Sequence, residues 1–145
     1  AIQTCNDRLR RRQISGRPHG LLLIYPEGNY IRASIQTPYL QIGELKYGKP
    51  ILDRIISADL PLEDAARCAL VSMDSSMRSN ASVGPPIELS IYEADSFVGG
   101  RHVVLDEHDE YLIQLRAAWE SSLKNAFNEL PRLPSSPPSV RLVDG

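Results

Sequence analysis

Apolar residues recur along this chain in two patterns, one with the spacing of strands and one with the spacing of helices. A continuous apolar run at residues 21–25 is followed by turn residues at 26–29 and by a second extended segment at 30–33. Two extended segments separated by proline, glycine and asparagine predict a hairpin. Residues 39–43 are a third strand candidate, whose last residue, Gly43, stands where a strand would pass into a helix.

Two helices are predicted next. Residues 46–56 fit a helix because Pro50 is tolerated in a first turn. The second helix is expected to begin at Pro61, to carry acidic residues in its first turn, and to end before Gly84. Its apolar and small residues recur at three- and four-residue steps, which predicts a face packed into a core. That stripe consists of Leu62, Ala65, Ala66, Ala69, Leu70, Met73 and Met77.

The last third of the chain predicts two more strands and a long helix. Apolar and polar residues alternate at 87–92, which is typical of a half-buried strand, and residues 103–105 form a further short strand after a glycine pair. A helix is expected at 110–130, with one apolar face made of Leu112, Leu115, Trp119, Leu123, Phe127 and Leu130. This grouped order of strands and helices favours an α+β fold over an alternating parallel sheet.

Composition divides the chain into three segments. Residues 1–16 hold a run of arginines without periodic apolar partners, and a solvated end explains this run more simply than a phosphate-binding segment. Residues 17–132 form the single predicted domain. Residues 133–145 are rich in proline and serine and are expected to be disordered.

The charge balance limits the classes of partner. A formal net charge of -2 and an apolar share of 42% are ordinary for a soluble globular protein, so neither nucleic acid nor a membrane is an expected partner. The cytoplasm is the expected compartment. Two cysteines are too few for a disulfide framework, and Cys68 is expected to behave as a small buried apolar residue.

One candidate metal site combines His102 with the run of acidic residues and histidine at 106–110. Carboxylates and imidazoles bind divalent metals. Acidic side chains are also favoured just before a helix by its dipole alone, and this second explanation is preferred. No metal and no cofactor are therefore assigned.

A second candidate is the polar end of the second predicted helix, at residues 72–82. Serine and asparagine can satisfy orphan helix carbonyls there, or they can line a site on a loop. A third candidate, the glycine- and lysine-containing segment 43–49, lacks the spacing of a phosphate-binding loop. The residues alone thus predict an α+β domain and leave its reaction open.

Residues 20–97 resemble a known family in long blocks. The blocks are LLLIYPEGNYIRAS, TPYLQIGELKYGKPILDR, LEDAARCALVSMDSSMRSN and SVGPPIELSIYE, and a looser resemblance continues to Pro134. They are similar to the ancestral beta-subunit (Anbu) type of bacterial proteasome homologue. The resemblance implies an N-terminal nucleophile hydrolase fold, in which two stacked sheets form an αββα sandwich between helical layers. It also implies a cytoplasmic homo-oligomer that cleaves peptides or unfolded proteins with an N-terminal threonine, whose α-amine is the base.

The chain departs from the family at its start. Residues 1–16 do not match, and the only threonines are Thr4 and Thr37, neither of which stands at the first position. The resemblance therefore implies the C-terminal part of a proteasome-like domain at 17–132, an incomplete fold, and no catalytic residue in this chain. The expected function is that of a truncated threonine peptidase subunit in protein degradation. The alternative is a non-catalytic assembly subunit or an inactive gene remnant.

Four residues are carried over from the resemblance as accessory to the active site. Gly43 and Glu44 are similar to the strand-to-helix turn near the nucleophile in proteasome subunits, although Glu44 replaces a serine. Asn80 and Ser82 are similar to the loop whose aspartate and serine support the threonine. Asn80 cannot carry the charge of an aspartate, but it can still hold an amine by hydrogen bonds.

Overall fold

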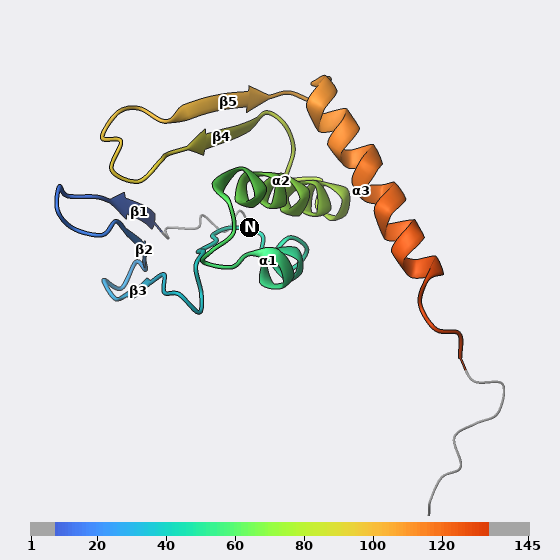
Figure 1. Ribbon diagram of the computed structural model, residues 1–145, viewed down its shortest axis with the longest axis horizontal. Helices are drawn as coiled ribbons and strands as arrows, with labels where there is room; N and C mark the ends of the chain where they lie inside the picture. The colour runs from blue at the N-terminus through green and yellow to red at the C-terminus, as the bar shows by residue number, and fades with distance from the viewer. Residues whose placement is uncertain (1–7, 134–145) are drawn as a thin grey trace, which may run out of the picture.

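The computed structural model describes residues 8–133, which form two antiparallel sheets and three helices (Figure 1). The first half contains β1 (Arg8–Arg12), β2 (Gly20–Ile24), β3 (Tyr30–Arg32) and α1 (Lys49–Ile55). The second half contains α2 (Leu62–Ser79), β4 (Ile87–Ile91), β5 (Arg101–Leu105) and α3 (Glu110–Asn128). This order confirms the predicted α+β organisation. Most of the predicted C-terminal tail lies outside the described residues.

The arginine run forms a strand, which the sequence pattern did not predict. In the register of β1 with β2, Leu9 stands opposite Leu23, which is buried, and Arg10 stands opposite Leu22. Alternation therefore places Leu9 and Leu23 on one face of the sheet, while Arg8, Arg10 and Arg12 share the other. The run is solvated as expected, since all five residues of β1 are exposed, but it is also ordered as a strand through its pairing with β2. Arginines on this edge strand also oppose unwanted strand pairing.

Gln13 ties the end of β1 to the connection between β4 and β5. Its side-chain oxygen accepts a hydrogen bond from the Tyr92 hydroxyl at 2.8 Å, and its amide nitrogen donates to Asp95 at 2.7 Å. The guanidinium of Arg11 lies over the Tyr92 ring, 4.1 Å from its centroid. The two hydrogen bonds join residues that are 79 and 82 positions apart in sequence. They fix β1 from outside its own sheet.

The core lies where α2 meets the hairpin of β4 and β5 and the start of α3. Figure 1 shows α2 between this hairpin and α1, with α3 extending away to one side. Leu70, Ile87, Leu105 and Leu112 form the buried cluster. Met73 and Met77 pack against it partly buried, which confirms the inner part of the predicted α2 stripe, whereas Leu62 is exposed. Cys68 is buried and unpaired as expected, and burial raises the pKa of its thiol.

Two predicted boundaries need correction. Residues 39–43 are not a strand, because the chain turns after β3, where the Ser34 N–H donates to the Thr37 carbonyl, and finds no sheet partner among the described residues. The helix predicted at 46–56 is the shorter α1, which follows Gly48 and holds Pro50 in its first turn as predicted. The strands β2, β4 and β5 and the helices α2 and α3 lie within a few residues of their predicted positions.

The predicted apolar face of α3 is only partly covered. Leu112 is fully buried, whereas Leu123 is 50% and Phe127 72% exposed. The N-terminal turns of α3 therefore pack into the core, and its C-terminal turns present apolar side chains outward. Neither this helix nor α1 or α2 combines the length and apolar character needed to cross a bilayer.

Candidate functional site

The four residues proposed as accessory to an active site lie together. The Asn80 side-chain amide donates a hydrogen bond of 3.1 Å to the Glu44 carboxylate, and its carbonyl oxygen accepts from the Ser82 N–H at 2.9 Å. Gly43 immediately precedes Glu44. The two segments are 36 residues apart in sequence, so the fold alone brings them into contact.

Local structure fixes each of these side chains. Gly43 has a φ of 82°, in the left-handed region that glycine adopts without strain, and this lets the chain turn sharply before Glu44. The Glu44 carboxylate also accepts the Lys46 N–H at 2.9 Å. This backbone donor of the segment 43–49, considered above for anion binding, is therefore already occupied. Asn80 is the C-terminal cap residue of α2, where its N–H donates to the Ser76 carbonyl. Its contact with the Ser82 N–H makes an Asx-type turn that holds the amide toward Glu44.

The remainder of the polar α2 end has structural roles instead. Ser72 and Ser76 are buried, and the Ser76 hydroxyl donates to the Ser72 carbonyl at 3.2 Å. Both serines lie against Gly48, where a β-carbon would come within 2.3 Å of the Ser72 hydroxyl oxygen. Small residues on both sides let α1 approach α2 closely. The candidate cluster at residues 72–82 is therefore divided into a packing part and the Asn80–Ser82 loop.

Asp74 joins α2 to α3. Its side chain is 5% exposed, and its two oxygens lie 2.7 Å from Arg116 Nε and 3.2 Å from Arg78 Nε. Arg78 also contacts Glu120 on α3 at 3.2 Å. Asp74 therefore links α2 to α3 through two guanidinium groups, which gives this buried carboxylate a structural role.

The histidine and acidic residues considered for metal binding are used locally. The Asp109 side chain caps α3 by accepting the Leu112 N–H at 3.1 Å, and Asp106 accepts the His108 N–H at 2.8 Å. His102 pairs with Ser90 on the neighbouring strand at 2.9 Å. Across residues 8–133, no group of three or more histidine, cysteine or acidic side chains is arranged to hold a metal ion. Asp109 therefore acts at the start of α3, where the sequence favoured an acidic side chain because of the helix dipole.

The accessory residues offer hydrogen-bond acceptors rather than a nucleophile. The Glu44 carboxylate and the Asn80 carbonyl oxygen both retain unused lone pairs after their contacts with protein groups. Such acceptors suit a ligand group rich in N–H donors, such as an amine. Both residues are half-buried, which strengthens their electrostatic effect over that of fully exposed groups. The arrangement can therefore orient an amine, but it cannot by itself cleave a peptide.

A second polar cluster, which sequence reasoning missed, lies beside α1. The Lys49 ammonium contacts both Asp53 oxygens, at 2.7 and 2.8 Å, and the Tyr39 hydroxyl donates to the same carboxylate. The lysine contact lowers the pKa of Asp53, and the carboxylate in turn raises the pKa of Lys49. Burial, followed by the Asp53 hydrogen bond, raises the pKa of Tyr39. The i, i+4 spacing of Lys49 and Asp53 on a helix was the available signal.

This cluster gives a prediction for pH dependence. Because the pKa of Asp53 is lower in the folded state than in the unfolded state, its contribution to stability is present above the unfolded-state pKa. That contribution is lost as the pH falls through the folded-state pKa. A carboxyl titration followed by NMR should give a midpoint for Asp53 below the usual range of aspartate. Lys49→Met should raise this midpoint, whereas Lys46→Met should leave it unchanged; equal effects of both variants would contradict the assignment.

Comparison with solved structures gives strong similarity over most of the chain. A structure titled "Anbu (ancestral beta-subunit) from Yersinia bercovieri" has a TM-score of 0.84 and 47% identity, covering 88% of this chain and 55% of its own. Anbu from Hyphomicrobium sp. strain MC1 has a TM-score of 0.83 and 47% identity over 87% of this chain and 54% of its own. A helical assembly of the Anbu complex from Pseudomonas aeruginosa has a TM-score of 0.81 and 49% identity, covering 86% and 52%.

The present chain thus spans about half the length of these solved relatives. No protein-family model and no curated protein sequence matches it. The structural matches carry substantial identity as well as shape, so they indicate relatedness and not only a shared fold.

Proposed function

The chain belongs to the Anbu (ancestral beta-subunit) family, and from this premise we propose that it supplies residues that position the nucleophile of a proteasome-type peptidase site. In this proposal the nucleophile is an N-terminal threonine that lies outside the matched region. Gly43, Glu44, Asn80 and Ser82 position it. The substrates are peptides or unfolded protein segments, no cofactor takes part, and the fold is completed to an αββα sandwich in a cytoplasmic assembly.

The hydrogen bond between Asn80 and Glu44 is the observation that carries this proposal. It joins the loop after α2 to the turn before α1 and leaves acceptor oxygens on both side chains. An N-terminal nucleophile needs its α-amine held with the lone pair directed toward the hydroxyl. Acceptors that bind the amine N–H groups provide this orientation. The two segments therefore have the acceptor groups needed to position an α-amine, and they contribute no catalytic group of their own.

Peptidase kinetics of Asn80 variants, expressed from the natural gene, test the proposal. Asn80→Ala should lower kcat about tenfold with little change in KM, because losing about 1.4 kcal/mol of positioning energy affects the nucleophile and not the bound peptide. Asn80→Asp would put a second carboxylate beside Glu44. Two close carboxylates raise the pKa of one of them, so the lower limb of the pH–rate profile should move to higher pH.

Asn125→Ala is the matched control, because Asn125 is exposed on α3 far from the two segments in sequence. It should leave kcat and the pH profile unchanged. An equal loss of kcat in Asn125→Ala and Asn80→Ala would contradict the positioning role of Asn80. The intact mass and N-terminal sequence of the natural protein belong to the same experiment, and a natural protein without an N-terminal threonine and without peptidase activity would overturn the proposal.

A non-catalytic assembly subunit is the second candidate, and the exposed apolar side chains on α3 and just after it favour it. Leu123, Phe127 and Leu130 continue the face that Leu112 begins, yet at least half of each is exposed. Apolar side chains grouped in this way mark protein interaction surfaces. An oligomer of the natural protein that forms without peptidase activity would select this second function. An oligomer with activity would be consistent with the first.

A further inference from the structure

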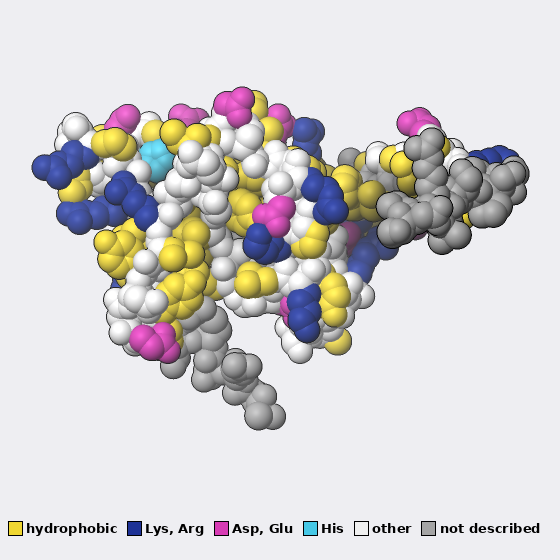
Figure 2. All heavy atoms as spheres, turned by 90° about the horizontal axis from the view of Figure 1, so that it is seen from below, with side chains coloured by type: hydrophobic (Ala, Val, Ile, Leu, Met, Phe, Trp, Pro, Cys, Tyr) yellow, Lys and Arg dark blue, Asp and Glu magenta, His cyan; other side chains and the backbone are white. Residues whose placement is uncertain are grey.

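A pocket on the outer face of the β1–β2–β3 sheet carries a strong positive charge. It is an open cavity of about 320 Å³, and its charged lining consists of Arg12, Arg17 and Arg32, with Tyr30 beside them. No acidic residue lines it. Figure 2 shows Lys and Arg side chains gathered at the end of the molecule where this sheet lies. Three positive charges in one pocket contrast with the formal net charge of -2 of the whole chain.

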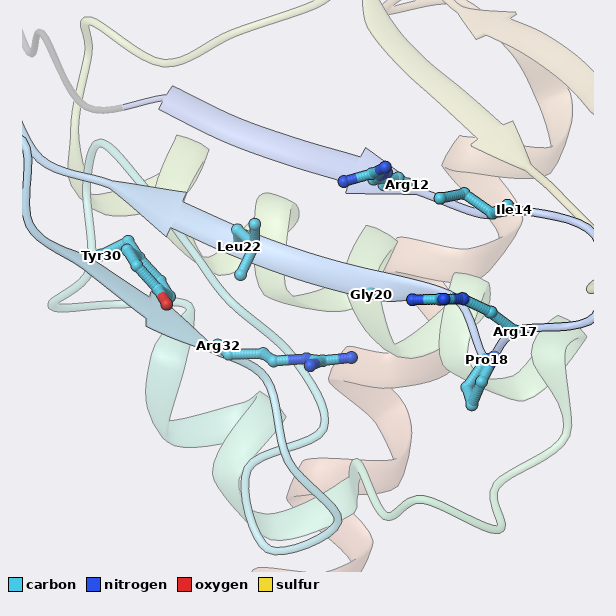
Figure 3. A pocket seen from close by; sticks show the side chains of 8 residues that line it. All are labelled: Arg12, Ile14, Arg17, Pro18, Gly20, Leu22, Tyr30 and Arg32. Atoms are coloured by element: carbon cyan, nitrogen blue, oxygen red, sulfur yellow. The ribbon is translucent and has the colours of Figure 1, made fainter.

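Three separate segments bring these arginines together. Arg12 ends β1, Arg17 lies in the loop between β1 and β2, and Arg32 ends β3. The run of arginines in β1 therefore does not account for the pocket, since two of the three guanidinium groups come from elsewhere. Figure 3 shows Arg12, Arg17 and Arg32 around the start of β2, near Gly20.

Gly20 forms part of the floor of the pocket. A β-carbon at this position would meet the guanidinium of Arg32 at 3.4 Å, so the planar group lies directly across the glycine backbone. The fixed plane of a guanidinium presents paired N–H donors that match carboxylate and phosphate oxygens. Within residues 8–133, none of the three arginines forms an ion pair with a carboxylate. Their positive charges are thus not neutralised by a carboxylate in the part of the chain that the structure describes.

We propose that this pocket binds a small polyanion, a ligand with two or more adjacent oxyanion groups. Guanidinium groups recognise phosphate and carboxylate through the same paired hydrogen bonds, so the shared chemistry is that of neighbouring oxyanions. A single anionic group can accept the paired N–H donors of one guanidinium. A ligand with adjacent anionic groups can bind Arg12, Arg17 and Arg32 together. The cavity volume falls in the range of small-molecule sites.

Calorimetric titration of the full chain at low ionic strength tests this proposal, with pyrophosphate and citrate as probes. Binding of at least one probe is expected, and Arg32→Gln should weaken it about tenfold or more, because a charge-assisted hydrogen bond is lost. Arg17→Gln should have a similar effect. Added salt should weaken binding further, since the pocket is open to solvent.

Arg132→Gln is the matched control, because Arg132 is exposed beyond α3 and does not line the pocket. It removes the same charge and should leave probe binding within about twofold. Preference for pyrophosphate would identify a phosphate-bearing ligand, and preference for citrate a carboxylate-bearing one. Binding of neither probe, or equal weakening by Arg132→Gln and Arg32→Gln, would overturn the proposal.

Discussion

Leu112→Ala is expected to lower the free energy of unfolding by about 3 kcal/mol. Leu112 is fully buried at the start of α3, where it belongs to the cluster formed with Leu70, Ile87 and Leu105. Truncation removes the transfer free energy of the lost methyl groups and leaves a cavity that surrounding residues fill only in part. These neighbours come from a helix and two strands of one hairpin, which cannot close in independently. Denaturant unfolding measures this loss.

Ile113→Ala is the control for this prediction. Ile113 follows Leu112 on the same helix and is 50% exposed, so the helix loses a similar side chain without creating a comparable cavity. Its cost should stay below about 1 kcal/mol, because only part of the transfer term applies. If Ile113→Ala were as destabilising as Leu112→Ala, α3 would bury a different face, and the packing of its first turns on α2 and the hairpin would be wrong.

Regular periodicity explains which elements could be predicted from the sequence. The alternation at residues 87–91 and the apolar spacing of α2 predicted their elements and the burial of Leu70. The strand β1 was not predictable in this way, since its pattern is almost entirely arginine and its pairing depends on β2. Residues 39–43 show the reverse case. They carry a strand-like composition, but strand formation needs a partner, and the chain turns away after β3.

Burial of polar residues was the harder part to predict. Ser72 and Ser76 stand on a helix among alanines and methionines, and nothing local indicates that a second helix contacts them. Only the position of Gly48 beside them in space explains their burial. Periodicity describes one element at a time, so it does not predict contacts between two helices. Gly48 and Ser72, which make such a contact, are about 25 residues apart in sequence.

The candidate site followed the same rule. Gly43, Glu44, Asn80 and Ser82 were selected by resemblance, and their spacing in sequence contained no sign that Asn80 would donate to Glu44. What could be foreseen locally was the glycine turn and the polar helix end. Contact between them requires α1 and α2 to pack closely, and that packing depends on Gly48. The site and the helix contact are therefore linked in a way that can be tested.

Gly48→Ala is expected to destabilise the fold by about 2 kcal/mol, because it overfills a closely packed contact. The new β-carbon would lie 2.3 Å from the Ser72 hydroxyl oxygen and 2.8 Å from the Ser72 carbonyl oxygen. The second atom belongs to the backbone of α2, so rotation of a side chain does not relieve it. The helices α1 and α2 must separate, which carries Glu44 away from Asn80. Thermal unfolding measures the first effect, and the NMR signals of the Asn80 side-chain amide protons, which donate to Glu44, report the second.

A double-mutant cycle distinguishes steric overlap from a general effect of alanine in α1. Ser72→Ala removes the hydroxyl oxygen and leaves the carbonyl, so Gly48→Ala should be less costly in that background, by roughly 1 kcal/mol. A matched cycle with Ser75→Ala should be additive, because Ser75 lies on the same helix but is not among the atoms closest to Gly48. If the Ser72 cycle were as additive as the Ser75 cycle, the cost of Gly48→Ala would not arise at the Ser72 hydroxyl oxygen, and only the overlap with the Ser72 carbonyl oxygen would remain to separate α1 from α2.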